Sequence, residues 1–335
     1  MRISFYETKN WEAEYIKKKS TGHELSFFEG PLNLKDPSGT DAEILVPFVG
    51  SELGAEVLQN FKNLKFIATR STGFDHIDLS ACKQKGILVS NVPTYGENTV
   101  AEFAFALILA LSRKLYPALK RIKEQGDFNY EGLTGFDLKG KTLGVAGTGH
   151  IGAHVIKIAF GFGMKIKAYD PHPNQQFVKD YGVEFLELPE LIKQSDILTL
   201  HVPYLPATHH LINSENIKLF KPTSFLINTA RGALVETEAL LLALKSGRLA
   251  GAGLDVLEEE GFIKDEMSLL REGHPSREEL KTVLADHELM YMNNVLITPH
   301  NAFNTEEAMQ RILDTTISNI ESFVKGAPVN LVKMD

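Results

Sequence analysis

Cysteine is almost absent from this sequence, since Cys82 is the single one among 335 residues. One thiol excludes an intrachain disulfide and a zinc site built from several cysteines. We expect Cys82 to lie half-buried on a helix and to be unreactive. We also expect no metal site, because the histidines lack paired-ligand spacing such as H-E-x-x-H. They include His201, His209, His210, His274 and His287.

Long apolar runs and clusters of positive charge are also missing. The most apolar helix candidate, residues 103–111, is far shorter than the roughly 18 residues that a membrane span needs. The charged residues that follow positions 1–6 do not fit a signal peptide. A formal net charge of −8, with one basic run at residues 17–19, argues against nucleic acid as the main partner. We therefore expect a cytoplasmic protein with no membrane or nucleic-acid partner.

What is present is a globular composition, with 43% hydrophobic and 23% charged residues, in a chain long enough for two domains. Short apolar segments alternate with helical ones along most of the chain. Strands that alternate with helices predict a parallel sheet covered on both faces. In the first hundred residues the expected strands are 3–6, 25–28, 44–48, 64–69 and 87–90.

The stretch from Lys141 to Asp170 reads as a strand, a glycine turn, a helix and a second strand. Gly147, Gly149 and Gly152 form a G-x-G-x-x-G turn, whose backbone can approach a pyrophosphate at the helix N-terminus. Asp170 ends the second strand, where a carboxylate can accept hydrogen bonds from an adenosine ribose. This acid favours NAD over NADP, because a 2′-phosphate would meet a like charge. Taken alone, the glycine motif also fits an ordinary turn between a strand and a helix.

These patterns predict an α/β fold with two domains, each a parallel sheet flanked by helices. We assign residues 98–302 to a Rossmann NAD-binding domain with a six- or seven-stranded sheet. Residues 1–97 plus 303–335 would form a discontinuous, flavodoxin-like substrate domain, to which an amphipathic helix at 305–325 returns. The helix from 97 to about 116 is apolar nearly all round and should be buried between domains or against a second subunit. We expect Pro117 to kink or end it, and an acidic, helix-prone insertion at 258–294.

Polar residues gather at the predicted carboxyl ends of the strands, where ligands bind in parallel α/β sheets. One arginine, several acids and one histidine converge on the edge that holds the nucleotide. They are Arg231, Asp255, Glu258, Glu259, Glu260 and His300.

With these residues in place, the chain resembles the NAD-dependent D-2-hydroxyacid dehydrogenases, and within that family it is most similar to the D-lactate dehydrogenases. The matching stretches span most of the chain in the family's order. They are RSTGFDHIDL (70–79), GTGHIG (147–152), LHVPYLPATHHLI (200–212), INTARGALVE (227–236), GAGLDVLEEE (251–260) and TPHNAF (298–303).

The resemblance implies a catalytic arginine, glutamate and histidine at Arg231, Glu260 and His300. Glu260 is placed by standing five residues after Asp255, and its neighbours at 258 and 259 remain alternatives. His300 is suited to give a proton while a 2-oxo acid is reduced. A neighbouring carboxylate favours the charged imidazolium. Arg231 would bind the substrate carboxylate and polarise the carbonyl.

The resemblance also implies residues that contact substrate and cofactor. The backbone N–H groups of Ser71, Thr72 and Gly73 are expected to hold the substrate carboxylate, and Tyr95 to face a small 2-oxo acid. NAD is expected to contact the glycine turn, Asp170 and a further set of residues. That set is His150, Ile151, Val202, Pro203, Thr208, Thr229, Ala230 and Asp255.

We therefore predict an NAD-dependent D-2-hydroxyacid dehydrogenase, a homodimer through its NAD-binding domain, that closes a cleft around its substrate. The expected reaction is the reversible reduction of pyruvate to D-lactate. One alternative is a dehydrogenase for another acid, such as glycerate or a longer 2-hydroxy acid. A second is a non-enzymatic, NAD(H)-sensing binding protein of the same fold.

Overall fold

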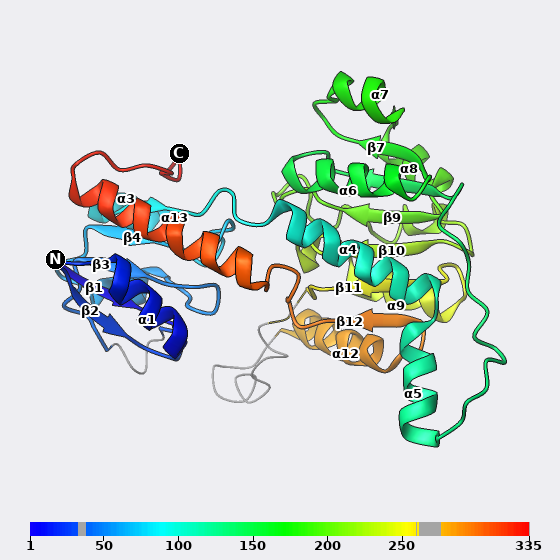
Figure 1. The fold of residues 1–335 in the computed structure, drawn as a ribbon, viewed down its shortest axis with the longest axis horizontal. Helices are drawn as coiled ribbons and strands as arrows, with labels where there is room; N and C mark the ends of the chain where they lie inside the picture. Colours follow the sequence, from blue (N-terminus) through cyan, green and yellow to red (C-terminus); the bar gives the residue numbers. More distant parts are fainter. Residues whose placement is uncertain (33–37, 259, 261–275, 335) are drawn as a thin grey trace. The chain divides into compact units, whose positions relative to one another are not determined.

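The computed structural model describes residues 1–335 except 33–37, 259, 261–275 and 335. The chain divides into two compact units, one formed by residues 1–96 and 304–335 and the other by residues 97–303. Each unit contains one parallel sheet with helices on both faces, so the predicted fold class is confirmed (Figure 1).

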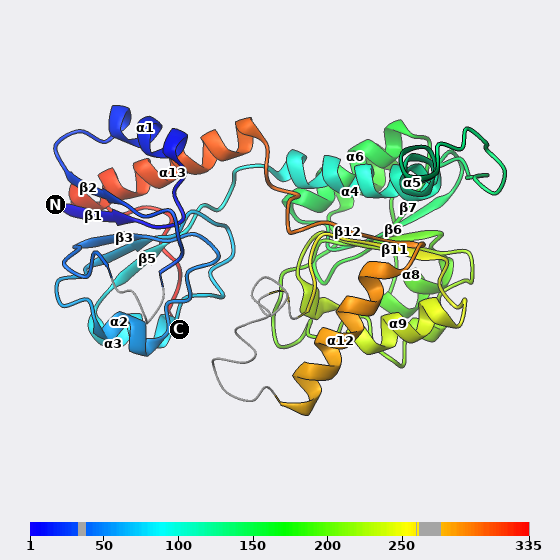
Figure 2. The same ribbon diagram turned by 90° about the horizontal axis from the view of Figure 1, so that it is seen from below.

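The sheet of the first unit has five strands, close to the five predicted segments. They are β1 (Arg2–Phe5), β2 (Glu24–Phe27), β3 (Ile44–Val46), β4 (Phe66–Ala68) and β5 (Leu88–Ser90). All neighbouring pairs are parallel, in the order β2-β1-β3-β4-β5. The helices of this unit are α1 (Asn10–Lys19), α2 (Ala55–Gln59), α3 (Leu79–Lys85) and α13 (Glu306–Val324). Helices α1 and α13 cover one face of the sheet, and α2 and α3 cover the other (Figure 2).

The C-terminal helix α13 packs its apolar side against the first sheet. Leu313, Ile317 and Ile320 are buried in one core with Phe66 of β4. The ring of Phe323 also stacks on Phe66, with 4.3 Å between the ring centroids. Helix α13, near the end of the chain, thus belongs to the same compact unit as β1 at its start.

Cys82 lies on α3, as predicted, but it is fully buried rather than half-buried. Burial raises the pKa of its thiol to about 11. Because the thiolate is the reactive form, an enclosed and protonated thiol is inert.

The sheet of the second unit has seven strands, all parallel. They are β6 (Thr142–Ala146), β7 (Lys165–Tyr169), β8 (Glu184–Phe185), β9 (Ile197–Leu200), β10 (Phe225–Asn228), β11 (Gly251–Leu254) and β12 (Val295–Ile297). Their order is β12-β11-β10-β9-β6-β7-β8. From β6 the strand order continues through β7 to β8 at one edge of the sheet, and through β9, β10 and β11 to β12 at the other edge. Such a switch point is where nucleotides bind in open parallel sheets.

Helices cover both faces of the second sheet (Figure 2). The face covered by α4 and α6 is opposite the face covered by α8, α9 and α12. The helices are α4 (Glu97–Ser112), α5 (Leu115–Gln125), α6 (His150–Gly161), α7 (Gln175–Tyr181), α8 (Leu188–Gln194), α9 (Thr237–Lys245) and α12 (Arg277–Tyr291). Two short 3-10 turns are η1 (Ile217–Leu219), between β9 and β10, and η2 (Gly232–Leu234), between β10 and α9.

Helix α4 ends earlier than the sequence analysis predicted. It stops at Ser112, Lys114 takes a positive φ of 50°, and α5 begins at Leu115. Pro117 therefore does not end a helix but lies in the first turn of α5, where its missing N–H has no intrahelical partner to lose. The apolar side chains of α4, such as Phe105, are buried against α6 and the sheet. Contacts within the second unit thus explain why α4 is buried, whereas the sequence analysis places this helix between domains or against a second subunit.

The predicted acidic insertion at 258–294 contains helix α12 in its C-terminal part. Residues 259 and 261–275 of the insertion lie outside the described residues. Within the described ranges, no helix is long and apolar enough to span a bilayer. The same ranges contain no group of three His, Cys, Asp or Glu side chains placed to hold a metal ion.

Candidate active site

The glycine turn after β6 has the geometry of a phosphate cradle. Gly147 has a φ of +93°, and a Cβ there would lie 2.7 Å from the carbonyl of His201, so only glycine fits. A Cβ on Gly152 would lie 2.1 Å from the carbonyl oxygen of Gly147, and its absence lets α6 pack closely. At Gly149 no atom lies within 4 Å of the Cβ position, which leaves open space at the N-terminus of α6. A pyrophosphate fits there, facing the free N–H groups of the helix.

Asp170 follows β7 and faces the same turn. Its Oδ2 accepts hydrogen bonds from the backbone N and the hydroxyl of Thr148, both at 2.7 Å, and its Oδ1 accepts one from the backbone N of His172 at 2.9 Å. Burial alone would raise the pKa of Asp170, but these hydrogen bonds outweigh it and lower the pKa. The turn therefore has a charged carboxylate beside it, which fits an adenosine ribose and repels a 2′-phosphate.

Replacing Asp170 is expected to weaken the preference for NADH over NADPH. Without the repulsion, Asp170→Ala should tighten NADPH binding relative to NADH by about tenfold, equivalent to about 1.4 kcal/mol. Quenching of protein fluorescence by each cofactor gives the ratio of the two Kd values. Asp170→Asn keeps the shape and loses the charge, so it should behave in the same way. A wild-type protein that binds both cofactors equally would contradict this role for Asp170.

The other residues predicted to contact the cofactor stand at one edge of the second sheet. Because the strands are parallel, the residues that follow neighbouring strands share that edge. They are Val202 and Pro203 after β9, Thr229 and Ala230 after β10, and Asp255 after β11, while His150 and Ile151 open α6. The hydroxyl of Thr208 accepts from the backbone N of Leu205 and donates to the carbonyl of Pro203, each at 2.8 Å. The contacts of this set with NAD stay predictions.

Asp255 organises the loop that carries His300. Its carboxylate accepts hydrogen bonds from the hydroxyl of Thr298 at 2.5 Å and from the backbone N of Asn301 and of Ala302, each at 2.8 Å. Burial raises the pKa of Asp255, and these hydrogen bonds oppose that effect. His300 has a positive φ of 52°, a conformation that is uncommon for histidine. The Asp255 network therefore holds a strained loop, a role that the sequence analysis did not assign to this residue.

Glu260 lies against the imidazole of His300. The distance between Glu260 Oε1 and His300 Nδ1 is 2.9 Å, and the side chains are 32% and 25% exposed. A carboxylate at Nδ1 holds the ring and leaves Nε2 as the position from which a proton can be given. Of the two described acids that the sequence left open, Glu260 is the one that contacts His300, and its catalytic role stays a prediction. Glu259 lies outside the described residues.

Arg231 lies between β10 and η2, on a loop fixed by its neighbours. Its backbone O accepts a hydrogen bond from the Nδ2 of Asn228 at 2.8 Å, and the Oδ1 of Asn228 accepts one from the backbone N of Ala230 at 3.0 Å. The Nη1 of Arg231 donates to the carbonyl of Ala230 at 2.8 Å. The side chain is half-buried at the carboxyl edge of the sheet, where a planar guanidinium can bind a carboxylate through two parallel hydrogen bonds.

The loop predicted to hold the substrate carboxylate follows β4 in the first unit. The hydroxyl of Ser71 donates to the carbonyl of Gly73 at 2.6 Å, and that of Thr72 donates to the carbonyl of Val92 at 2.7 Å. The side chain of Asn91 donates to the carbonyl of Thr72 at 2.8 Å. The side chains of the loop thus fix its backbone, which is the part expected to recognise the substrate.

Two buried or anchored groups support this part of the first unit. Arg70 is 1% exposed, and its Nη2 donates to the carbonyls of Tyr6 and Glu7 at 2.7 Å each, while its Nη1 lies 3.3 Å from Glu12. The sequence analysis missed this anchor, since a buried arginine has no local signature. Tyr95 is half-buried, and its carbonyl accepts a hydrogen bond from Arg311 of α13. Its contact with substrate stays a prediction.

The imidazole of His201, just after β9, gives the fold a pH dependence. Its Nε2 lies 2.8 Å from the hydroxyl of Thr199, and burial lowers its pKa to about 3. An unfolded histidine titrates near pH 6.5. Between these values the unfolded chain binds a proton that the folded chain does not. The free energy of unfolding should therefore fall as the pH falls below about 6.5, by at most about 1.4 kcal/mol per pH unit from this residue.

Urea unfolding at pH 7.0 and pH 5.5 tests the contribution of His201. In His201→Gln the fall in the free energy of unfolding between the two pH values should be smaller than in the wild type. His172→Gln, which removes an exposed histidine, is the matched control and should keep the wild-type difference. Equal pH dependence in wild type and His201→Gln would show that the imidazole of His201 does not titrate as proposed.

Comparisons with known proteins identify the family and agree with the fold. Residues 105–302 match the family model for the D-isomer specific 2-hydroxyacid dehydrogenase, NAD binding domain. The chain is 40% identical to 2-hydroxyacid dehydrogenase A of Aspergillus oryzae over 332 residues, covering 97% of this chain and 92% of that protein. It is 36% identical to the D-lactate dehydrogenase of Escherichia coli over 333 residues, covering 97% and 98%. The crystal structure of D-lactate dehydrogenase from Aquifex aeolicus complexed with NAD and lactic acid aligns with a TM-score of 0.86 and 37% identity, covering 97% of this chain and 96% of that one.

Proposed function

Because the chain belongs to the NAD-dependent D-isomer-specific 2-hydroxyacid dehydrogenases, we propose that its reaction is the reversible reduction of pyruvate to D-lactate. The observation that carries the proposal is the 2.9 Å pair of His300 and Glu260 at the sheet edge that also holds Arg231 and the glycine turn. The names of the Escherichia coli and Aquifex aeolicus relatives support lactate as the hydroxy acid.

Each of the three side chains has a distinct task in the proposed mechanism. When bound, NADH supplies the hydride that reduces the carbonyl carbon. Arg231 binds the substrate carboxylate and polarises the carbonyl oxygen, on which negative charge develops. His300 donates a proton to that oxygen, and in the reverse direction takes it back. Glu260 orients the ring of His300 and stabilises its protonated form.

Residues of the first unit are proposed to recognise the substrate. We assign to the backbone N–H groups of Ser71, Thr72 and Gly73 the binding of the substrate carboxylate, because the side chains of that loop fix its backbone. Tyr95 is proposed to restrict the size of the acid.

Oxidation of NADH in the presence of a panel of 2-oxo acids tests the proposed function. We expect pyruvate to have the highest kcat/KM, with hydroxypyruvate and longer 2-oxo acids turned over more slowly. A preference for one of those acids would support the proposed type of reaction and identify a substrate other than pyruvate. An absence of turnover with every acid, in a protein that still binds NADH, would favour the sensing protein over the enzyme.

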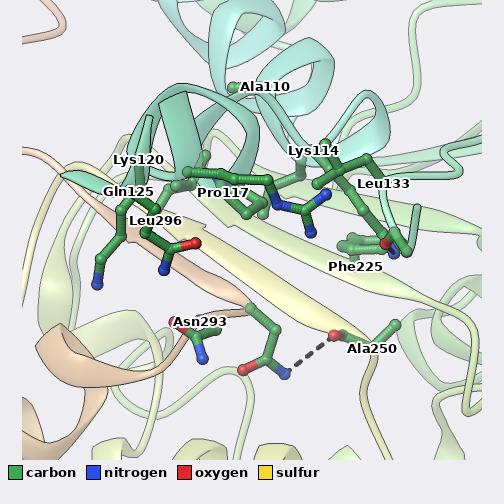
Figure 3. A pocket seen from close by; sticks show the side chains of 14 residues that line it. Ala110, Lys114, Pro117, Lys120, Gln125, Leu133, Phe225, Ala250, Asn293 and Leu296 are labelled. Carbon is green, nitrogen blue, oxygen red and sulfur yellow. Dashed lines mark hydrogen bonds between the residues drawn. The ribbon is translucent and has the colours of Figure 1, made fainter. Parts of the chain in front are cut away.

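We also propose that two copies of the chain pair through the NAD-binding unit. Helix α5 is described along its whole length and none of its residues is buried. Its apolar side chains include Leu119, which is 55% exposed, and Phe128 just beyond the helix is 92% exposed. Beside α5 lies a hollow of about 680 Å³, with Phe225 and Leu296 in its lining (Figure 3). An apolar surface of this kind is typical of a protein interface.

The mass in solution tests the proposed pairing. Light scattering after gel filtration should give about twice 37.2 kDa for the wild type. Leu119→Asp should yield the monomer. Val178→Asp changes a similarly exposed apolar residue on α7 and should leave the mass unchanged. A monomeric wild type would refute the pairing.

A further inference from the structure

We propose that Glu258 is a positioning residue that holds Glu260 and Arg231 in place by joining the two loops that carry them. The inference rests on the proposed function, since it concerns the same reaction. In the sequence Glu258 is only an alternative to the catalytic glutamate. In the structure its carboxylate has partners of its own, which are His210 and Thr237.

The carboxylate of Glu258 connects three segments of the second unit. Its Oε1 lies 2.5 Å from the Nε2 of His210, and its Oε2 accepts hydrogen bonds from the hydroxyl and the backbone N of Thr237 at 2.9 and 3.2 Å. Glu258 is 14% exposed and His210 is 30% exposed. Thr237 is the first residue of α9, where a negative charge is stabilised by the helix dipole. Both carboxylate oxygens of Glu258 therefore contact other segments of the unit, and these contacts fix the position of the backbone at Glu258.

His210 is itself held in a specific conformation. It has a positive φ of 49°, and its backbone N donates to the carbonyl of Ala233 in η2 at 2.9 Å. The ring of His209 stacks on its imidazole, with 3.8 Å between the centroids. The partner of Glu258 is thus fixed to the same 3-10 turn that follows Arg231.

The backbones of the two loops touch beside Glu258. A Cβ on Gly232 would lie 1.9 Å from the carbonyl oxygen of Leu257 and 2.5 Å from the backbone N of Glu258. Arg231 directly precedes Gly232, and Glu260 stands two residues after Glu258. A shift of the backbone at Glu258 would therefore displace Glu260, which contacts His300, and the loop that carries Arg231.

Two variants disturb the contacts of Glu258 in different ways. Glu258→Gln removes the charge, and Glu258→Asp keeps it but shortens the side chain, which then cannot reach His210 and Thr237 together. If Glu258 acts by position, both should lower kcat for pyruvate reduction by about ten- to a hundredfold, the cost of a misplaced catalytic group. Glu238→Gln, an exposed glutamate in the first turn of α9, is the control and should keep the wild-type rate.

The split between kcat and KM distinguishes positioning from a general loss of stability. A misplaced Glu260 lowers kcat and a misplaced Arg231 raises the KM for pyruvate, whereas a smaller folded fraction lowers the apparent kcat and leaves KM unchanged. Both Glu258 variants should therefore show a lower kcat together with a higher KM for pyruvate.

These experiments test the positioning role of Glu258 even if one variant does not fold. A wild-type KM for pyruvate in Glu258→Asp would overturn the positioning role, whatever the change in kcat. If the Glu258 variants do not fold, His210→Asn replaces them, because asparagine tolerates a positive φ and cannot reach Glu258 in the same way. An unchanged KM for pyruvate in His210→Asn would then overturn the role.

A readout without turnover separates this proposal from the proposed function. Deuterium uptake by the peptide that contains Leu257 and Glu258 should rise in Glu258→Asp and stay at the wild-type level in Glu238→Gln. Failure of the wild type to reduce any 2-oxo acid would refute the proposed function alone. Unchanged uptake in Glu258→Asp would refute the joining of the two loops, whether or not the wild type is active.

Discussion

His300→Asn is expected to lower kcat for pyruvate reduction by about a hundred- to ten-thousandfold, the range for loss of a general acid. The imidazole is the group that Glu260 contacts at 2.9 Å, and asparagine cannot give a proton to the carbonyl oxygen in its place. Asparagine suits this position because it tolerates the positive φ of 52°. Steady-state rates over a range of pyruvate concentrations give the change.

The affinity of the His300→Asn protein for NADH identifies the cause of its lower rate. NADH should bind with nearly the wild-type Kd, since the glycine turn and Asp170 are unchanged. A variant with more than a tenth of the wild-type kcat would remove His300 from the proposed mechanism.

Arg231→Gln is expected to lower kcat/KM for pyruvate by about a hundred- to a thousandfold, because the variant loses both the binding of the carboxylate and the polarisation of the carbonyl. Arg231→Lys keeps the charge without the planar fork and should recover part of the loss. The backbone of the loop is held by Asn228, so both variants should keep their fold.

The split between kcat and KM tests the two tasks assigned to Arg231. Loss of substrate binding raises KM, and loss of carbonyl polarisation lowers kcat. We expect Arg231→Gln to change both. Arg248→Gln, which alters an arginine whose Nη1 donates to the carbonyl of Lys218 outside the proposed site, is the matched control. Equal kinetics in Arg231→Gln and Arg248→Gln would rule out a catalytic role for Arg231.

The sheets and the glycine turn were predictable from the sequence because their signals are local. An apolar run such as residues 143–146 forms a buried parallel strand, Gly147 has a positive φ, and Gly152 lies against the carbonyl oxygen of Gly147 in the same turn. The position of Pro117 was misjudged for a reason that is also local. A proline is as compatible with the first turn of a helix as with its end, and the break at Lys114 has no strong sequence signal.

The contacts within the site were less predictable, because they join residues far apart in the chain. The pairing of Glu260 with His300 was expected only through the family resemblance, and spacing alone left Glu258 as an alternative. The roles of Asp255 and Glu258 as supports for loops depend on strand order, which brings β10, β11 and β12 together. The sequence contains a weak signal for the role of Asp255, because Thr298 stands two residues before His300 and can donate a hydrogen bond to an acid that follows the neighbouring strand.

The most direct test of the central claim is the transfer of deuterium to pyruvate from NADH that carries deuterium in both hydrogen positions at C4 of the nicotinamide. The account predicts that the wild-type protein forms D-lactate with one deuterium at C2, as measured by mass spectrometry after chiral separation. Formation of L-lactate, of lactate without deuterium, or of no lactate from pyruvate would contradict it.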